Sequence, residues 1–175
     1  MEKFLETFKD GHHEKYKIDE NGNLLDAYKS YKITHTEYIA RTELRKSLEE
    51  KLNPLFNYVF ENKKCQMKVR FSKNSFGKIT SDKAVTKSVV NGFSLQEHFE
   101  TCEKIKEIFE EAEFVGSFPD RKNDPNIIAM HRLQKCVELS TGKKCFAYLT
   151  MKEVKKEGNR FYTMELLIKK YPSSN

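Results

Sequence analysis

The last third of the chain contains three strand-length segments joined by two short turns, and this pattern constrains the fold more than any other. The segments are Ile127–Leu139, Cys145–Val154 and Arg160–Lys169. Ser140-Thr141-Gly142-Lys143 and Glu157-Gly158-Asn159 connect them, and both are hairpin-like sequences. Strands joined by turns this short pair with their neighbours in opposite directions. The sequence therefore predicts an antiparallel sheet.

The middle segment shows which side of this sheet faces the core. Successive strand residues point to opposite faces, so its side chains divide into two sets. One set is small and aliphatic, and it consists of Cys145, Ala147, Leu149 and Met151. The other set consists of Phe146, Tyr148, Thr150 and Lys152. We expect the first set to pack on a helix and the second to form an aromatic, hydroxyl and lysine row on an open face.

The clearest helix signal lies just before this sheet. Ser94-Leu95-Gln96-Glu97 is a capping box, in which the serine hydroxyl and the glutamate side chain each satisfy a backbone N–H of the first turn. The helix is expected to continue to about Glu113. Its apolar stripe comprises Leu95, His98, Phe99, Cys102, Ile105, Ile108, Phe109 and Ala112. The acids lie mostly off that stripe, so the helix is expected to pack on the sheet with an acidic outer face.

The N-terminal part is predicted to be helical. Residues 1–9 resemble a short amphipathic helix, which Asp10-Gly11 would end, and Asp19–Asn23 is a turn signal. A second helical pattern starts at Thr34 or Thr36 and runs to about Phe60. Asn53-Pro54 should divide it into two helices, because proline disfavours helix in the preceding residue.

Between these regions, Gln66–Lys73 alternates as a half-buried strand, and Asn74–Gly92 has the Gly, Ser, Thr and Lys content of a loop. The prediction is an α+β fold, with N-terminal helices and a capped amphipathic helix on a roughly four-stranded antiparallel sheet. Residues 1–60 would form an N-terminal helical layer and residues 61–175 the α+β domain, together in one compact unit.

Charge is strongly segregated along the chain. The net charge of +6 combines −1 over residues 1–60, +6 over 61–92, −5 over 93–114 and +6 over 115–175. Basic regions of this kind attract a polyanion, and nucleic acid is the commonest one in a cytosol. A lysine-rich surface that is merely solvated is the alternative interpretation. With 13 Phe and 8 Tyr, the chain can still bury a globular core.

The cysteines indicate a reducing compartment. Cys65, Cys102, Cys136 and Cys145 form no CxxC pair and no spacing typical of zinc, so we expect free thiols, no metal site and a cytoplasmic protein. No apolar run has the roughly 18 residues that a membrane span requires. The acidic N-terminus does not resemble a signal peptide.

One histidine and one strand surface are candidates for chemistry. His131 lies in the apolar run Ile127–Leu133, where alternation puts it on the side of Ile127, Ala129 and Leu133. It is either a buried structural histidine or, since imidazole titrates near neutrality, a general acid or base. The row Tyr148, Thr150 and Lys152 is either an ordinary solvent-facing surface or a site for a stacked base and a phosphate.

Several segments, taken in order, resemble a known superfamily. They are Val69-Arg70-Phe71-Ser72-Lys73-Asn74-Ser75-Phe76-Gly77-Lys78, a helix ending in Glu-Glu-Ala, Met130-His131-Arg132, Thr141-Gly142-Lys143, Tyr148–Glu153 and Phe161-Tyr162-Thr163. This order resembles the barnase–EndoU–colicin–RelE-like nucleases and the associated domains of large polyvalent proteins of phages and mobile elements. The resemblance covers roughly residues 65–168 and leaves residues 1–60 outside.

The resemblance implies helices on a four-stranded antiparallel sheet, and RNA cleavage on the open sheet face without metal or cofactor. By position, Lys73 and Lys78 match the basic residues after the first strand, His131 matches a strand-borne histidine, and Tyr148 with Thr150 matches a polar pair on the penultimate strand. The two-histidine arrangement of the EndoU branch is absent, so the resemblance leaves the enzyme assignment open.

Two functions are therefore expected from the sequence. In a metal-independent, toxin-like endoribonuclease, His131 would transfer protons, Lys73 and Lys78 would stabilise the phosphate, and Tyr148 and Thr150 would position it. Flanking phosphates would be held by Arg70, Lys87, Arg132 and Lys152. The partners would be RNA or another nucleic acid and an acidic immunity or antitoxin protein. The alternative is a non-catalytic nucleic-acid-binding or protein-docking module of a mobile element or phage.

Overall fold

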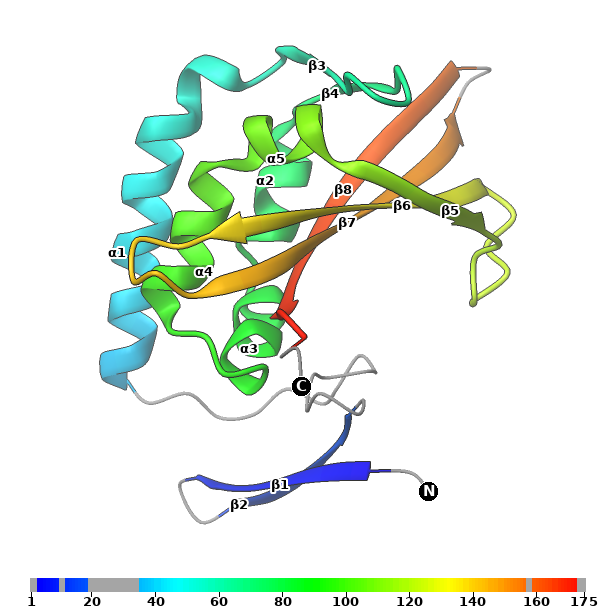
Figure 1. The fold of residues 1–175 in the computed structure, drawn as a ribbon. Coiled ribbons are helices and arrows are strands. Elements are labelled where there is room, and N and C mark those ends of the chain that lie inside the picture. Colours follow the sequence, from blue (N-terminus) through cyan, green and yellow to red (C-terminus); the bar gives the residue numbers. More distant parts are fainter. Residues whose placement is uncertain (1–2, 10–11, 19–34, 157–158, 173–175) are drawn as a thin grey trace.

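A four-stranded antiparallel sheet forms the centre of the computed structural model, which describes residues 3–9, 12–18, 35–156 and 159–172. Its strands are β5 (Glu113–Phe118), β6 (Ile127–Glu138), β7 (Lys144–Lys156) and β8 (Asn159–Lys170), paired in that order. Figure 1 shows the helices gathered on one side of this sheet, while the β5–β6 connection extends away from them. The predicted α+β class with a four-stranded antiparallel sheet is confirmed.

The three C-terminal strands agree with the prediction to within two residues at each end. The fourth strand is different from the one expected. It is β5, which follows the acidic helix, and not the segment Gln66–Lys73. The connection between β5 and β6 begins after Phe118.

The two faces of β7 divide as the alternation predicts. Its small and aliphatic side chains are fully buried, with an exposed fraction of 0% for Cys145, Ala147, Leu149 and Met151. Phe146, Tyr148, Thr150 and Lys152 are only half-buried. In β8 the buried residues are Met164, Leu166 and Ile168, which complete the same core face. The opposite side, the open face, carries the half-buried row.

The capped helix is confirmed, with one interruption. α4 (Leu95–Glu103) begins with the predicted capping box, in which the Ser94 hydroxyl accepts from the Glu97 N–H and the Glu97 carboxylate accepts from the Ser94 N–H. The helix breaks at Lys104 and resumes as α5 (Ile105–Glu111). Apart from half-buried Leu95, all the residues of the predicted apolar stripe are buried.

The helix before Pro54 is also confirmed, but the one after it is not. α1 (His35–Leu52) ends in the 3-10 turn η1 (Asn53–Leu55), as the proline requires. The chain then forms β3 (Val59–Glu61), which pairs with β4 (Lys68–Arg70) in a separate two-stranded sheet. The prediction of a strand over residues 66–73 is thus correct only for its central residues.

The predicted loop over residues 74–92 is wrong, because this segment forms two helices. α2 (Lys73–Ile79) and α3 (Asp82–Val90) each begin after a serine whose hydroxyl accepts a backbone N–H: Ser72 caps α2 and Ser81 caps α3. Both helices pack against the edge strand β8. Serine supplies the caps that make such short helices possible, although the same residue type also suggests a loop.

The predicted helix over residues 1–9 is wrong as well. Lys3–Lys9 forms β1, which pairs with β2 (His12–Ile18) as an antiparallel hairpin (Figure 1). The predicted turns Asp10-Gly11 and Asp19–Asn23 lie outside the described residues. The division into residues 1–60 and 61–175 stays a prediction. None of the described helices is long and apolar enough to cross a membrane.

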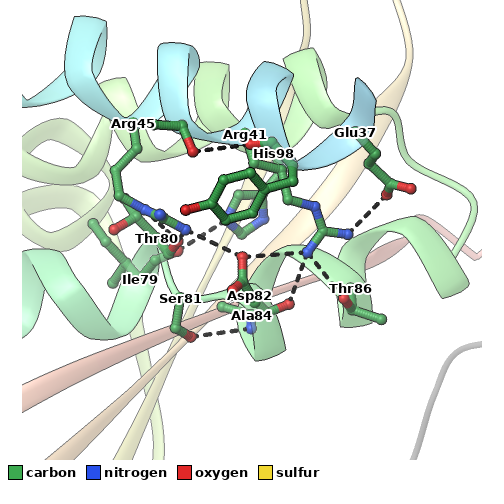
Figure 2. Close-up of polar contacts among 12 residues, drawn as sticks. Glu37, Arg41, Arg45, Ile79, Thr80, Ser81, Asp82, Ala84, Thr86 and His98 are labelled. Carbon is green, nitrogen blue, oxygen red and sulfur yellow. Dashed lines mark hydrogen bonds and ion pairs between the residues drawn. The ribbon is translucent and has the colours of Figure 1, made fainter. Parts of the chain in front are cut away.

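A buried polar network joins α1 to α2 and α3 (Figure 2). Arg41 of α1 is 1% exposed, and its guanidinium donates to the Glu37 carboxylate at 2.9 Å, the Asp82 carbonyl at 3.3 Å and the Thr86 hydroxyl at 3.2 Å. Arg45 donates to the Thr80 carbonyl at 2.8 Å. A guanidinium that is removed from water needs such a set of acceptors, so the network holds α1 in one position against α3.

His98 of α4 makes a second buried link. Its Nε2 donates to the Ile79 carbonyl at 2.8 Å, and its Nδ1 accepts from the Ser88 hydroxyl at 2.7 Å. Burial lowers the pKa of His98 to about 4, and the nearby charge of Arg41 acts in the same direction. The ring is therefore neutral at pH 7, with its proton on Nε2.

Replacing Arg41 with methionine should destabilise the fold by about 2–4 kcal/mol, because it leaves the buried acceptors around the guanidinium unpaired. Arg45→Met is the matched control, since Arg45 also contacts Asp82 but is 33% exposed. Its cost should be about 1 kcal/mol or less. Urea unfolding at pH 7 measures both values. Equal losses for the two variants would contradict the role assigned to Arg41.

The pKa of His98 predicts a loss of stability in mild acid. The folded-state value of about 4 lies below the ordinary 6.5, so between these values the unfolded chain binds a proton that the folded protein does not. Stability should therefore fall by roughly 2–4 kcal/mol from pH 6.5 to pH 4 through this group. Urea unfolding of the wild type and of His98→Gln across this range tests it. Parallel pH profiles of the two proteins would contradict the assignment.

Candidate functional site

The open face of the sheet brings together polar residues from three strands. Directly opposite residues of antiparallel strands share a face. Thr150 of β7 lies between Arg132 of β6 and Glu165 of β8, and Lys152 is opposite Thr163. Four of the residues expected from the sequence to bind or act on a phosphate or a base therefore share this face. They are Arg132, Tyr148, Thr150 and Lys152.

Two further lysines reach the same region from the helices beside β8. Lys78 of α2 donates to the Thr163 hydroxyl at 3.3 Å, and its Nζ lies 4.0 Å from the Glu165 carboxylate. The Nζ of Lys152 lies 3.3 Å from the same Glu165 oxygen. Lys87 of α3 lies near enough to Glu165 and Lys152 for its pKa to respond to both. Glu165 is thus the point at which lysines from α2, α3 and β7 meet.

These groups border a cavity of about 250 Å³ between α2, α3 and β8. We call it the lysine pocket, with Lys78, Lys83, Lys87 and Glu165 in its lining and Lys152 next to it. Three lysines and one carboxylate thus line the pocket, and the ammonium group of Lys152 lies beside that carboxylate. The volume is small for an organic cofactor but sufficient for a phosphate group and its water.

The electrostatics of the lysine pocket favour an added anion. Burial lowers the pKa of Lys87, and the nearby Lys83 and Lys152 lower it further, while Glu165 opposes the change. Burial also lowers the pKa of Lys78, against the opposing effect of Glu165. A lowered lysine pKa means that the positive charge is under-compensated in the folded protein. A bound phosphate would supply the missing negative charge.

Aromatic side chains continue the open face along β7, away from the pocket. The rings of Phe146 and Tyr148 lie 6.0 Å apart, and Phe146 stacks on Tyr171 at 5.0 Å. The Nζ of Lys169 lies 5.3 Å from the centre of the Tyr148 ring. Rings that carry a cation on one side can hold a planar, electron-rich group such as a nucleobase.

Two predicted phosphate ligands do not belong to this surface. The Nζ of Lys73 is 3.9 Å from the carboxylate of Glu49 in α1 and 5.6 Å from the ring centre of Phe56. Arg70, in the separate sheet, donates to the Asn57 carbonyl at 3.3 Å. The structure therefore joins Lys78, Lys87 and Lys152 but does not bring Lys73 or Arg70 to them.

His131 lies on the other side of the sheet. It is opposite the buried Met151, so it shares the core-side face with Leu133, as the alternation predicts. Its Nε2 is 2.8 Å from the Glu153 carboxylate, and its Nδ1 is 2.8 Å from the Ser117 hydroxyl. Its side chain is 15% exposed. The structure thus separates His131 from Tyr148 and Thr150, with which the sequence-based ribonuclease hypothesis combines it.

Sequence reasoning missed Lys83, Glu165, Ser117 and Glu153. The alternation of β8 could have placed Glu165 on the open face, and helical spacing could have aligned Lys83 with Lys87. No local signal predicts that Ser117 lies opposite His131. The pairing of their strands shifts register between Phe114 and Gly116, and this shift decides which residues are opposite.

Comparison with known proteins identifies one family. The family model described as large polyvalent protein-associated domain 3 matches residues 40–162. No curated protein and no solved structure matches the chain. The match confirms the expected relation to large polyvalent proteins, and it names no nuclease superfamily. It covers more than half of the chain, including α2, α3 and the open face of β7. The chain therefore belongs to the large polyvalent protein-associated domain 3 family.

Proposed function

We propose that this domain binds single-stranded RNA, with a backbone phosphate in the lysine pocket. The observation that carries the proposal is the meeting of Lys78, Lys87 and Lys152 around Glu165. These lysines come from two helices and one strand, so their convergence is a property of the fold. Phosphate contacts supply most of the affinity of proteins for nucleic acid, and lysine is a common donor for them.

The burial of these lysines supports the proposal over a merely solvated surface. An exposed lysine keeps its full hydration, and its charge does little for stability. In the lysine pocket, burial lowers the pKa of both Lys78 and Lys87, so holding them charged costs free energy in the folded protein. An anionic ligand would recover that free energy on binding. The aromatic row with Tyr148 offers stacking surfaces for the bases next to the bound phosphate.

A second candidate function, metal-independent RNA cleavage, is favoured by the position of Glu165. A carboxylate opposes phosphate binding, so its presence among lysines is better suited to proton transfer than to affinity. Glu165 would accept the 2′-hydroxyl proton, and Lys78, whose pKa is lowered by burial, would stabilise the phosphate or protonate the leaving oxygen. Thr150, opposite Glu165, would orient the phosphate. If the domain cleaves RNA, an acidic immunity protein would be the partner for this surface.

Binding should depend on the lysine pocket and on salt. Lys78→Gln, Lys87→Gln and Lys152→Gln should each weaken binding of a single-stranded oligoribonucleotide by roughly tenfold, or about 1.4 kcal/mol. Each should also reduce the slope of log affinity against log salt by about 0.7. Lys106→Gln is the matched control, because it removes the same charge from the acidic helix, where Lys106 pairs with Glu110 at 2.7 Å. Fluorescence anisotropy measures these affinities. Equal weakening by the control would contradict binding at the pocket.

Cleavage is tested by incubating the protein with single-stranded RNA in EDTA. If the lysine pocket is catalytic, Glu165→Gln should reduce the rate by about 10²-fold or more, and His131→Ala should leave it nearly unchanged. The reverse result would support the sequence-based hypothesis, in which His131 transfers the protons. If the protein binds RNA in EDTA but forms no cleavage product, the domain is a binding module without ribonuclease activity.

A further inference from the structure

Ser117, His131 and Glu153 form a hydrogen-bonded chain that the proposed RNA surface does not use. We call these three residues the Ser117 cluster. They come from β5, β6 and β7, on the face of the sheet opposite to Tyr148 and Thr150. Any role for the cluster is therefore independent of RNA binding at the lysine pocket.

The two hydrogen bonds of His131 orient its ring. The Glu153 side chain is 7% exposed, and its carboxylate can only accept, so the Nε2 of His131 carries the proton in the 2.8 Å contact between them. In the neutral ring, Nδ1 then holds the lone pair, and the Ser117 hydroxyl donates to it at 2.8 Å. A carboxylate thus positions the base, and the base faces a hydroxyl.

This is the arrangement that activates serine nucleophiles. The general requirement is a hydroxyl within hydrogen-bond reach of a base that a third group orients. In the familiar triad the serine meets Nε2 and the carboxylate meets Nδ1. The two nitrogens exchange places in the Ser117 cluster, but the direction of proton transfer from the serine to an oriented imidazole is the same.

Aromatic side chains lie beside the Ser117 cluster, and the serine itself is accessible. Ser117 is exposed and lies in β5, an edge strand of the sheet. The rings of Phe114 and Tyr162 are 6.3 Å and 6.2 Å from the ring of His131, measured between centres. Phe114 is itself 46% exposed. An apolar or aromatic acyl group could contact these rings while its carbonyl approaches the serine.

We propose that Ser117 is a nucleophile for activated carboxylic esters with an apolar acyl group. The Ser117 Oγ forms a bond to the carbonyl carbon while its proton passes to Nδ1 of His131. The ester C–O bond then breaks, and the departing alcohol takes that proton. Water attacks the acyl-serine by the same route, which releases the carboxylic acid and restores the hydroxyl. Ser117 and His131 are the catalytic residues of this step, and Glu153 is a positioning residue.

The experiment exposes the full chain to a fluorophosphonate, which phosphonylates activated serines with loss of fluoride, and to p-nitrophenyl butyrate. Labelling should map to Ser117 by mass spectrometry, and Ser117→Ala should abolish both labelling and ester hydrolysis. His131→Gln should slow labelling by at least about 10²-fold. Ser140→Ala is the matched control and should react like the wild type. Its hydroxyl also lies 2.8 Å from a carboxylate, that of Glu100, but none of the histidines whose side chains the structure describes forms a hydrogen bond with Ser140.

A cluster that only ties the strands together would give a different result. The native chain would then label no faster than urea-unfolded chain, or the label would persist in Ser117→Ala, and either outcome overturns the proposal. Glu153→Gln supplies a readout that a structural role would not move. Without the carboxylate, the imidazole is no longer held with its lone pair on Nδ1, so labelling of Ser117 should slow by at least about tenfold, and Glu153→Asp should restore part of the rate. An unchanged rate in Glu153→Gln, in a variant that is folded by circular dichroism, would contradict the positioning role.

Discussion

The buried hydrogen bonds of His98 hold the two short helices beside β8 in place, and the lysine pocket depends on them. Nε2 of His98 binds the carbonyl of Ile79, and Nδ1 binds the hydroxyl of Ser88. Each partner is the immediate neighbour of a pocket lysine, Lys78 in one case and Lys87 in the other. A polar group this deeply buried must be satisfied, so the histidine accepts only one arrangement of α2 and α3.

Arg41 strengthens the same arrangement from α1. Its guanidinium joins α1 to α3 through the Asp82 carbonyl and the Thr86 hydroxyl, as Figure 2 shows. Short helices have little stability of their own, and these two are seven and nine residues long. Their positions therefore come from the caps, the polar links and the burial of Phe76, Ile79 and Val85. Rigid support of this kind is what a cluster of like charges requires.

The sheet keeps two kinds of chemistry apart. Its open face carries lysines, hydroxyls and aromatic rings, which suit a nucleic-acid ligand. Its core-side face is buried along most of its length, but beside β5 it holds the Ser117 cluster, where the Glu153 carboxylate orients His131. The match to large polyvalent protein-associated domain 3 over residues 40–162 includes the Ser117 cluster and the lysines of the lysine pocket, whereas Glu165 and most of β8 lie beyond it.

The sequence by itself determined the local elements whose signals are short in range. The alternation in β7, the turns between the long strands, the capping box at Ser94 and the break at Pro54 each depend on residues within a few positions of one another. It also placed Tyr148, Thr150 and Lys152 on the open face. For His131 the alternation predicted the side of Leu133, but the ribonuclease hypothesis combined this histidine with Tyr148 and Thr150. The sequence failed where a helix depends on contacts with distant strands: α2 and α3 have weak local signals, and their apolar residues become decisive only against β8.

Only the tertiary structure decided that Lys78 and Lys87 meet Lys152 at Glu165, and that Ser117 meets His131. Those contacts join positions far apart in the chain, and strand register and helix packing set them.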